Sequence, residues 1–463
     1  MSTNGKPDEP LGPPPSTPRF HQMLHMGAEL HVLLHGLLRT YGDFVRWRGF
    51  HDVYLVNHPD FIRPVLTRDY RHFSKRTIDY RVLAQVMGNG LVTNDGPHWV
   101  QQRKLIQPMF GNHRVNGFDG TINTLTSSLM DEWETRAGGE TLRIDREMSR
   151  LTFRIVGATL FGSDLKRHGD EIAEILEVAN LNPLETRALM TLCSWVPTPH
   201  NLKWRRAVRR LDEIVYGLIQ ARRRRGVGHD DILDHLIHAL DESDYEGMDV
   251  KQMRDEVVTL MLAGHETSAN ALAWTLYLLS AHPDVEARLT ESLDATLNGA
   301  PATADDLPRI PYLKQVVQES MRIYPPVWSY VRRAERQEEF NGCLLPAGAH
   351  VVVVPYSLHR HPEFWPDPER FDPGRFDPNA SEGRHAFSYL PFAAGPRTCI
   401  GAGMAMLETQ LVLAQILQRF KVRMVPDHPI ETTGKVTLRP RYGILATLNR
   451  RPSIRLRKPS APG

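Results

Sequence analysis

The chain has 463 residues, of which 41% are hydrophobic and 24% charged, and this balance excludes a disordered or a membrane-embedded protein. The formal net charge of +2 excludes a whole-chain bias towards nucleic acid, so no nucleic-acid partner is expected. Three cysteines are too few for a disulfide scaffold and suit a reducing compartment.

Composition along the chain predicts one large domain with short tails. Residues 1–19 are polar and rich in proline, and we expect a flexible N-terminal segment. Residues 20–455 contain no repeat or low-complexity linker and are expected to form a single domain. Residues 456–463 are expected to be a flexible tail.

The sequence predicts no segment that enters a membrane. The polar N-terminus lacks the apolar stretch of a signal peptide. The most apolar helical window, residues 257–279, contains His265, Glu266 and Asn270, which are costly to place in lipid. We therefore expect a soluble, cytoplasmic protein of bacterial type.

The N-terminal half begins with strands and continues with helices. Residues 43–48 and 52–57, separated by Gly49, predict a hairpin. A short helix is predicted to start at Pro59. From Pro97 to about residue 282 helical periodicity dominates, and proline in the first turn of a helix costs no hydrogen bond. Breaks between helices are expected at Gly138-Gly139 and at Gly226-Val-Gly228.

The C-terminal half alternates helices with irregular and strand-like segments. Its predicted elements are a long helix (255–281), a shorter helix stopped by prolines (314–323), a strand region (343–354), an irregular meander (361–380), a final helix (401–420) and a strand-like region with a turn (436–448). An ordered meander of that length itself indicates function. The predicted fold class is mostly α with small β-sheets, that is, α+β.

One cysteine lies in a glycine-rich loop directly before the final helix, in the sequence Phe392-Ala-Ala-Gly-Pro-Arg-Thr-Cys399-Ile-Gly401. A helix N-terminus favours a thiolate over a thiol, and a thiolate is the ligand that lets haem iron cleave the O–O bond. Glycines let the backbone pass close to a flat ligand. Arg397, two residues before the cysteine, can turn towards a haem propionate.

This loop resembles the cysteine loop of the cytochrome P-450 family of haem-thiolate monooxygenases. Its Phe-x-x-Gly-x-Arg-x-Cys-x-Gly pattern is matched at Phe392, Gly395, Arg397, Cys399 and Gly401. The resemblance extends over nearly the whole chain, from about residue 20 to about residue 450. It implies the single-domain fold of that family and haem b with the Cys399 thiolate as axial ligand.

A second motif, Ala263-Gly264-His265-Glu266-Thr267, lies inside the predicted long helix. A glycine there costs about 1 kcal/mol relative to alanine, and an acid in an apolar stretch adds a desolvation cost. We expect the Thr267 hydroxyl to bond a carbonyl one turn back. The stretch is similar to the family's Ala-Gly-x-Asp/Glu-Thr motif, which implies that Glu266 and Thr267 are catalytic and deliver protons to dioxygen. His265 occupies the variable position and is given no role.

The spacing of Glu319 and Arg322 puts both side chains on one helical face. The pair is similar to the family's Glu-x-x-Arg, which implies a buried structural network completed by an arginine of the meander. Arg370 and Arg375 both qualify. Arg375 is favoured by its position after Pro-x-x-Phe, although Gly374 stands where the family usually has an acid.

Three cationic or aromatic residues resemble the family's haem-propionate contacts. Trp99 and Arg103 are one helical turn apart and match the family's Trp-x-x-x-Arg. Arg332 follows Trp328 where similar proteins place a propionate-binding arginine. Its neighbour Arg333 is the alternative, since strand alternation points the two in opposite directions.

The resemblance implies an enzyme that activates O2 and hydroxylates or epoxidises a medium-sized, apolar small molecule such as a terpenoid, fatty acid or polyketide-like product. Electrons are expected from a separate ferredoxin or flavodoxin with its NAD(P)H reductase. An apolar stretch at residues 181–199 is expected to form a lid over the substrate. Two alternatives stay open: a peroxide-using or non-redox haem-thiolate enzyme, and a haem-based sensor.

Overall fold

The structure, a computed structural model, describes residues 14–18, 29–48, 52–136, 140–162, 171–172, 175, 196–226, 228, 231–241, 249–340 and 342–451. The expected break at Gly138-Gly139 and all but the last four residues of the expected lid lie outside these ranges. Two compact units make up the chain. The first comprises Met1–Arg81, Trp328–Pro368 and Arg384–Thr398, and the second comprises Val82–Val327, Glu369–Gly383 and Cys399–Gly463.

The first unit is built on a five-stranded sheet with the order β1-β2-β8-β5-β3. Its strands are β1 (Phe44–Trp47), β2 (Val53–Val56), β8 (His350–Val353), β5 (Tyr330–Ala334) and β3 (Phe73–Ser74). β1 and β2 pair antiparallel, which confirms the predicted hairpin, whereas β2 and β8 run parallel. Three successive valines of β8 are buried, as expected for a strand covered on both faces.

Short helices and a second hairpin complete this unit. They are α2 (Leu30–Tyr41), α3 (Pro59–Arg63), a π-helical turn (Pro64–Arg68), α16 (Pro355–Leu358), the 3-10 turns Tyr70–His72, Ala386–Ser388 and Gly395–Arg397, and the hairpin of β6 (Glu338–Phe340) and β7 (Cys343–Leu345). The predicted helix at Pro59 is confirmed. The strand region 343–354 is divided into β7 and β8 by a turn in which Gly348 has a φ of +81°. Within the proline-rich lead-in, Thr17 and Pro15 form backbone hydrogen bonds with Arg46.

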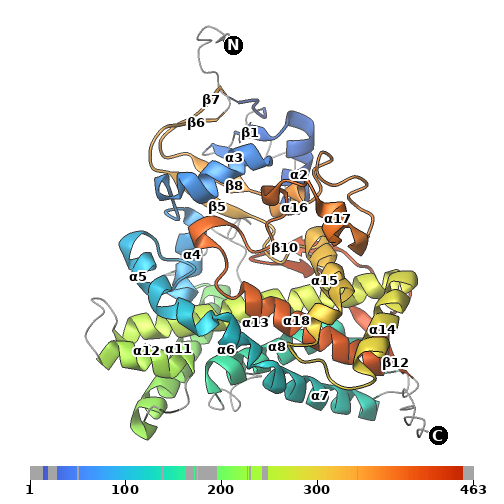
Figure 1. Cartoon of the computed structure of the whole chain (residues 1–463). Coiled ribbons are helices and arrows are strands. Elements are labelled where there is room, and N and C mark those ends of the chain that lie inside the picture. The colour runs from blue at the N-terminus through green and yellow to red at the C-terminus, as the bar shows by residue number, and fades with distance from the viewer. Residues whose placement is uncertain are drawn as a thin grey trace, which may run out of the picture. The chain divides into compact units, whose positions relative to one another are not determined.

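The second unit is mainly helical, and α13 runs through it (Figure 1). Its helices are α5 (Gly96–Ile106), α6 (Asn112–Asn116), α7 (Asp119–Arg136), α8 (Ile144–Leu160), α11 (Pro199–Arg225), α12 (Ile232–Asp241), α13 (Val250–Ala281), α14 (Pro283–Leu297), α15 (Pro311–Ile323), α17 (Pro378–Ser381) and α18 (Ala402–Arg419), with 3-10 turns at Gln107–Phe110, Leu307–Arg309 and Pro373–Phe376. The chain enters this unit within α4 (Ile78–Met87). α13 packs against α8, α11, α15 and α18, so it forms the centre of the unit.

Two small sheets flank these helices. One has the order β4-β12-β9, made by Leu142–Arg143, Leu445–Arg450 and Phe420–Met424. The other is a hairpin of β10 (Thr432–Gly434) and β11 (Leu438–Pro440). The strand-like region 436–448 is therefore shared between two sheets, and Gly443, with a φ of +77°, lies in the turn between them.

The helix boundaries differ from prediction where a polar residue or proline starts a helix early. α13 begins at Val250 rather than at 255, because the Asp249 side chain accepts a hydrogen bond from the Gln252 N–H at 2.6 Å. α15 begins at Pro311, in the first turn where proline is tolerated. The break after α11 is confirmed, because that helix ends at Arg225, immediately before Gly226.

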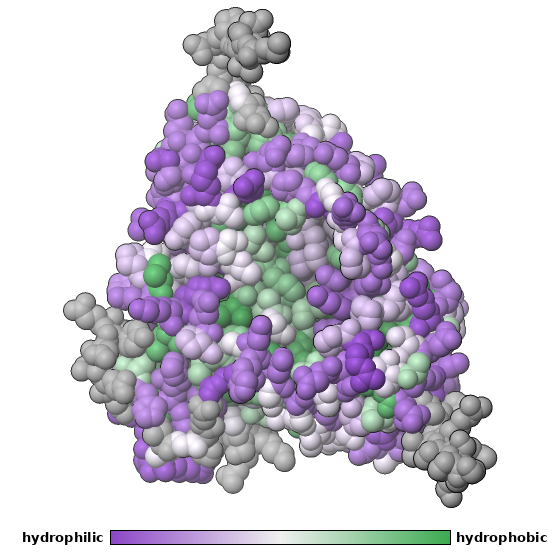
Figure 2. Space-filling view, in the orientation of Figure 1, coloured by the Kyte–Doolittle hydropathy of each residue, from purple (hydrophilic) through white to green (hydrophobic). Residues whose placement is uncertain are grey.

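On the face of the molecule shown in Figure 2, hydrophilic side chains surround a central area that contains many apolar side chains. Among the described residues, no helix is both long enough and apolar enough to cross a bilayer. The apolar residues of α13 are instead packed inside the second unit, where Leu272, Ala273 and Trp274 are completely buried.

Candidate active site

The cysteine loop makes a tight turn before α18. Gly395 has a φ of +70°, and a Cβ atom there would lie 2.1 Å from the carbonyl oxygen of Leu66. Only glycine therefore fits, because any side chain would collide with the π-helical turn behind the loop. The Thr398 backbone N–H and hydroxyl both donate to the Gly395 carbonyl, at 3.0 and 2.7 Å, and these bonds fix the loop up to Cys399.

Cys399 lies three residues before Ala402, the first residue of α18, and the Gly401 backbone N–H is directed at its sulfur. The residue is exposed, yet the surrounding chain desolvates the sulfur enough that burial raises the pKa of the thiol. The Gly401 N–H and the positive charge of Arg103 act in the opposite direction. The donor set therefore fits a thiolate ligand, because two of its neighbours favour the charged sulfur.

Arg103 and Trp99 lie one turn apart on α5, and the guanidinium carbon is 5.7 Å from the centre of the Trp99 ring. Trp99 is only 4% exposed. Burial lowers the pKa of Arg103, while the Cys399 sulfur opposes this. The structure thus brings Arg103 and Cys399 together, and a partly buried cation near a thiol is suited to an anionic ligand.

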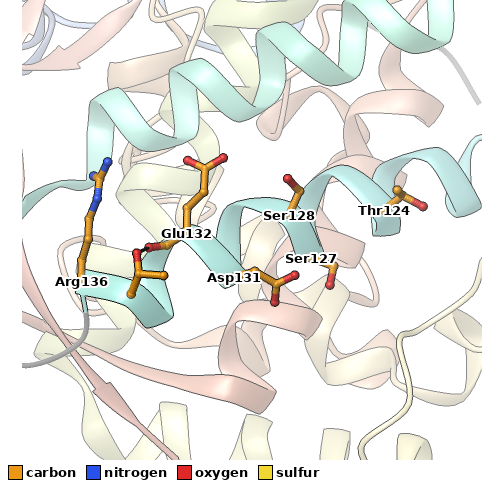
Figure 3. A pocket seen from close by; sticks show the side chains of 7 residues that line it. Thr124, Ser127, Ser128, Asp131, Glu132 and Arg136 are labelled. Atoms are coloured by element: carbon orange, nitrogen blue, oxygen red, sulfur yellow. Dashed lines mark hydrogen bonds between the residues drawn. The ribbon is translucent and has the colours of Figure 1, made fainter.

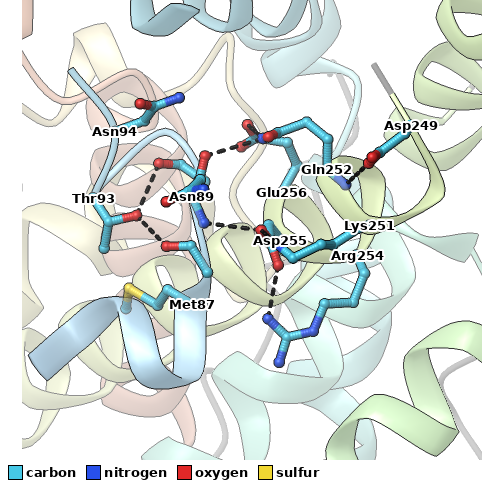
Figure 4. A network of polar contacts seen from close by, with 12 residues as sticks. Met87, Asn89, Thr93, Asn94, Asp249, Lys251, Gln252, Arg254, Asp255 and Glu256 are labelled. Carbon is cyan, nitrogen blue, oxygen red and sulfur yellow. Dashed lines mark hydrogen bonds and ion pairs between the residues drawn. The ribbon is translucent and has the colours of Figure 1, made fainter. Parts of the chain in front are cut away.

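The start of α13 holds the loop that leads into α5 (Figure 4). The Asp255 carboxylate accepts from the Asn89 N–H at 2.9 Å, and the Glu256 carboxylate accepts from the Leu91 N–H at 3.0 Å. On α5, the Gln102 side chain donates to the Asn89 carbonyl at 2.8 Å. These bonds fix the position of the helix that carries Trp99 and Arg103.

The second motif lies in the middle of α13. The Thr267 hydroxyl donates to the Ala263 carbonyl at 2.7 Å, which is the bond expected from the sequence. At Gly264 a Cβ atom would lie 3.0 Å from a methyl carbon of Val156, so α8 packs tightly against α13 at the glycine. His265 is buried, lies 2.7 Å from the Ser149 hydroxyl, and has its pKa lowered to about 4 by burial. It is therefore neutral at physiological pH and packs against α8.

Glu266 points towards the hairpin of β10 and β11. Arg439 Nε donates to Glu266 Oε1 at 2.6 Å, and the Thr437 hydroxyl donates to the same oxygen. The sequence did not indicate either partner, because a pairing across more than 170 positions leaves no local pattern. The predicted proton-delivering acid is therefore part of an ion pair.

The Glu319–Arg322 pair is completely buried. Arg322 donates to both carboxylate oxygens of Glu319, at 2.7 and 2.8 Å. Arg375 Nε lies 3.4 Å from Glu319 Oε1, while Arg370 is exposed and contributes its backbone carbonyl to Arg322. Burial raises the pKa of Glu319, and the guanidinium of Arg322 acts against that shift. Of the two candidates, it is Arg375 whose side chain reaches the carboxylate.

The remaining predicted cofactor residues belong to the first unit. Arg332 is 4% exposed and donates to the Tyr80 hydroxyl at 2.7 Å, whereas Arg333 on the opposite face of β5 is half-buried. Arg397 Nη1 donates to the Phe73 carbonyl at 2.9 Å. Phe392 is half-buried at the start of the cysteine loop.

A separate hollow runs along α7 (Figure 3). It is lined by polar residues, namely Thr124, Ser127, Ser128, Asp131, Glu132, Thr135 and Arg136. Asp131 pairs with Arg419 at 2.9 Å and Glu132 pairs with Arg150 at 2.7 Å, so its acids are already neutralised. It contains none of the predicted site residues.

Comparison with known proteins shows what this chain is similar to. A family model described as "Cytochrome P450" matches residues 10–446. Cyclooctat-9-en-7-ol 5-monooxygenase of Streptomyces melanosporofaciens is 36% identical over 392 residues, covering 84% of each chain. Pentalenene oxygenase of Streptomyces avermitilis is 32% identical over 423 residues, covering 90% of this chain and 92% of the relative.

The fold is matched by a crystal structure of the haem domain of cytochrome P450DA, with a TM-score of 0.85 and 25% identity over 96% of this chain and 99% of that one. This match confirms the predicted fold class of many helices with small sheets. The chain therefore belongs to the cytochrome P450 family and is a P450 monooxygenase, an oxidoreductase.

Proposed function

We propose that this protein is a haem-thiolate monooxygenase that hydroxylates or epoxidises a terpenoid with electrons from separate redox proteins. The observation that carries the proposal is the environment of Cys399. A thiol just before α18, with a backbone N–H directed at it and the positive charge of Arg103 acting on it, is suited to bind iron as a thiolate.

Haem b would be held by the Cys399 thiolate. By the family resemblance, its carboxylates, which need cationic or polar partners when buried, would pair with Trp99, Arg103, Arg332 and Arg397. Phe392 and Gly401 would contact the ring from the cysteine loop. When bound, the haem supplies reductive activation of O2 and insertion of one oxygen atom into a C–H bond or double bond.

The residues of α13 supply the protons. Each turnover consumes O2, two electrons and two protons, and yields one inserted oxygen atom and one water. The Thr267 hydroxyl, held at 2.7 Å from the Ala263 carbonyl, would orient a proton towards dioxygen. Glu266 would take up protons from solvent and pass them inward, while the neutral His265 stabilises the packing between α13 and α8.

The terpenoid class rests on the relatives. By their names, one acts on cyclooctat-9-en-7-ol and another on pentalenene, and both oxygenate their substrates. The central part of α13 agrees with an apolar substrate, since most of its side chains beyond the motif are aliphatic or aromatic. Apolar walls recognise a ligand mainly by shape and buried area.

The electron donor we propose is a small acidic ferredoxin or flavodoxin, reduced by an NAD(P)H-dependent reductase. The reconstituted system should convert cyclic terpene hydrocarbons and alcohols to products heavier by one oxygen atom, detected by mass spectrometry. Binding should shift the haem iron from low spin to high spin. If only charged or sugar-like compounds produced that shift, the terpenoid assignment would be overturned.

The same reconstitution separates the alternatives. Turnover with hydrogen peroxide alone, at the rate seen with the full electron-transfer chain, would favour a peroxide-using enzyme. Spectral binding without any product, for all donors tested, would favour a haem-based sensor.

A further inference from the structure

An excess of positive charge is concentrated on α11. This helix carries nine cationic side chains and two acids, a net charge of +7, whereas the whole chain has a net charge of only +2. The rest of the chain therefore has a net charge of −5. α11 packs against α12 and α13, and it lies at the edge of the second unit (Figure 1). Charge of one sign that is concentrated on one surface element indicates a partner of the opposite sign.

The apolar side of α11 faces the protein, and its basic side faces solvent. The buried side chains include Trp204, Leu211, Val215 and Ile219. Exposed cationic side chains recur at helical spacing on the other side and form what we call the basic face, made by Lys203, Arg206, Arg209, Arg210 and Arg224. A helix of 27 residues is about 40 Å long, so the basic face is a strip that extends from the first turns of α11 to its last.

Most cations of the basic face have no acid to neutralise them. Among the residues that the structure describes, four of them form no ion pair, namely Lys203, Arg206, Arg209 and Arg224. The two acids of α11 are engaged elsewhere. Glu213 pairs with Arg210 at 3.1 Å, and the Asp212 carboxylate accepts a hydrogen bond from Arg254 of α13 at 2.7 Å. A solvated helix face commonly mixes both signs, whereas the unpaired charges of this one are all positive.

The fold attaches α11 to α12 through a different arginine. Arg222 is 1% exposed, and its Nη1 atom lies 2.8 Å from an Asp231 oxygen and 2.6 Å from an Asp234 oxygen. Arg222 also donates to the Phe161 carbonyl at 3.0 Å. This neutralised, buried cation holds the two helices together, so the unpaired cations of the basic face are not needed for that packing.

Two features of α11 favour phosphate groups at a lipid surface as the partner. Arginine outnumbers lysine eight to one, and a guanidinium binds a phosphate through two parallel hydrogen bonds. Leu202 is 39% exposed and lies one turn before Arg206 on the basic face. An apolar side chain among cations can enter the acyl layer beside the headgroups that the cations bind. Neither a nucleic acid nor an acidic protein offers such a layer.

We propose that the basic face of α11 binds the surface of a membrane that contains anionic phospholipids, so that the protein works where its apolar substrate dissolves. The inference goes beyond the proposed function, and only its last clause rests on it. Each cation near an anionic leaflet strengthens binding about fivefold. Four unpaired cations therefore give an attraction of several hundredfold.

The test is sedimentation of purified, haem-containing protein with phospholipid vesicles, without substrate or electron donor. Vesicles of phosphatidylcholine mixed with phosphatidylglycerol should bind the protein, and vesicles of phosphatidylcholine alone should not. The affinity should fall as salt rises, because charges more than about 10 Å apart are screened at roughly 0.1 M. Equal binding to both kinds of vesicle would overturn the proposal, and so would binding to neither.

A triple variant, Lys203→Gln with Arg206→Gln and Arg209→Gln, removes three unpaired cations from the basic face. All three side chains are exposed, so the fold keeps its internal contacts. Because each cation contributes about fivefold, the variant should bind the mixed vesicles roughly 100-fold more weakly than the wild type. Circular dichroism and the haem spectrum check that it is folded, and unchanged affinity in folded protein would refute the proposal.

The matched control removes the same charge from other helices. It replaces with glutamine three exposed cations of α2, α8 and α15 that form no ion pair within the described part of the chain, namely Arg39, Arg146 and Lys314. This control should bind the mixed vesicles almost as tightly as the wild type. If it lost as much affinity as the triple variant, the net charge of the protein rather than α11 would govern binding, and the proposal would be wrong.

Two further measurements separate a lipid surface from other polyanions. Leu202→Ala should weaken binding to the mixed vesicles severalfold, because less apolar surface is buried. Unchanged affinity in Leu202→Ala would contradict the choice of lipid. Duplex DNA and polyglutamate are tested in the same buffer. If either bound the wild type more tightly than the vesicles and lost that affinity in the triple variant, the partner would be a nucleic acid or an acidic protein instead.

The two proposals fail in different ways. Vesicle binding is measured without turnover, so its absence would leave the proposed monooxygenase reaction intact. If the reduced carbon monoxide complex of the wild type lacked the thiolate spectrum, the proposed function would fall, and the vesicle assay would still decide whether α11 binds a membrane surface.

Discussion

The Arg322 guanidinium donates to both carboxylate oxygens of Glu319, and neither side chain has any exposed surface. A buried ion pair gains its energy only when its remaining hydrogen-bonding positions are satisfied. Here the Asp372 backbone N–H also donates to Glu319 Oε1 at 2.9 Å, and Arg375 approaches the same oxygen. The meander is thereby tied to α15 through one carboxylate.

We expect Arg375→Ala to destabilise the protein by about 3–5 kcal/mol, because it removes a cation from a buried charge network. Arg370→Ala is the matched control, since that arginine is exposed and contributes its backbone carbonyl, which survives the substitution. Thermal unfolding and haem content of the two variants measure the difference. A larger loss in Arg370→Ala would contradict the assignment of Arg375 to the network.

Cys399→His should abolish the long-wavelength Soret band of the reduced carbon monoxide complex, because imidazole cannot replace a thiolate as electron donor to iron. Cys343→Ser, a change at a half-buried cysteine on β7, should leave the band unchanged. Retention of the band in Cys399→His would show that another residue binds the iron.

Thr267→Ala should leave haem binding intact and raise the hydrogen peroxide released per NAD(P)H consumed severalfold, because the positioned hydroxyl is lost. Thr267→Ser keeps the hydroxyl and should remain close to wild type. Thr275→Ala removes a similar hydroxyl two turns later, which donates to Ala271, and tests the general effect of such a bond. Full coupling in Thr267→Ala would remove Thr267 from proton delivery.

The buried His265 should make the protein less stable in acid. Its pKa is about 4 in the folded chain and 6.5 for an ordinary histidine, so between these values the unfolded chain binds more protons. Stability from this residue is complete above pH 6.5 and declines as pH falls towards 4, by up to roughly 3 kcal/mol. Denaturant unfolding at pH 7 and pH 5 should show that His265→Gln loses less of its free energy of unfolding on acidification than the wild type does. The same change at the exposed His113 should not alter the loss, and equal losses in all three proteins would refute the prediction.

Gly264→Ala tests two opposing effects on α13. Alanine improves helix propensity by about 1 kcal/mol, but its Cβ would press on Val156, and overpacking typically costs 1–3 kcal/mol. We expect a net destabilisation of up to about 2 kcal/mol. In a Val156→Ala background the contact is relieved, so the same substitution should become neutral or stabilising. An identical cost in both backgrounds would mean that the contact with α8 is not the reason for the glycine.

The sequence predicts those features of the site that have a local cause. Gly395 precedes Cys399 in a turn that only glycine can make, and the Thr267 hydroxyl bonds a carbonyl within its own helix. Both patterns are complete within a few residues. The hairpin at residues 43–57 is likewise local, because its two strands are adjacent along the chain.

What the sequence did not predict depends on distant segments. Arg439 reaches Glu266 only because β11 packs on α13, and no sequence pattern near position 439 predicts that contact. The helix at Leu30–Tyr41 also escaped prediction, although Leu34, Leu37 and Leu38 form its buried face. Nor does the sequence explain by itself why Gly88 is glycine, since a Cβ atom there would lie 2.0 Å from the distant Asp255.

The way in which the loop before α5 is attached determines which of its residues can be substituted. The carboxylates of Asp255 and Glu256 accept hydrogen bonds from the backbone N–H groups of Asn89 and Leu91. Every residue except proline has such an N–H group. The path of the loop is therefore independent of most of the side chains that it carries. The glycines at 88 and 90 are the exceptions, because a Cβ atom at either position would collide with the side chain of Asp255 or Thr259.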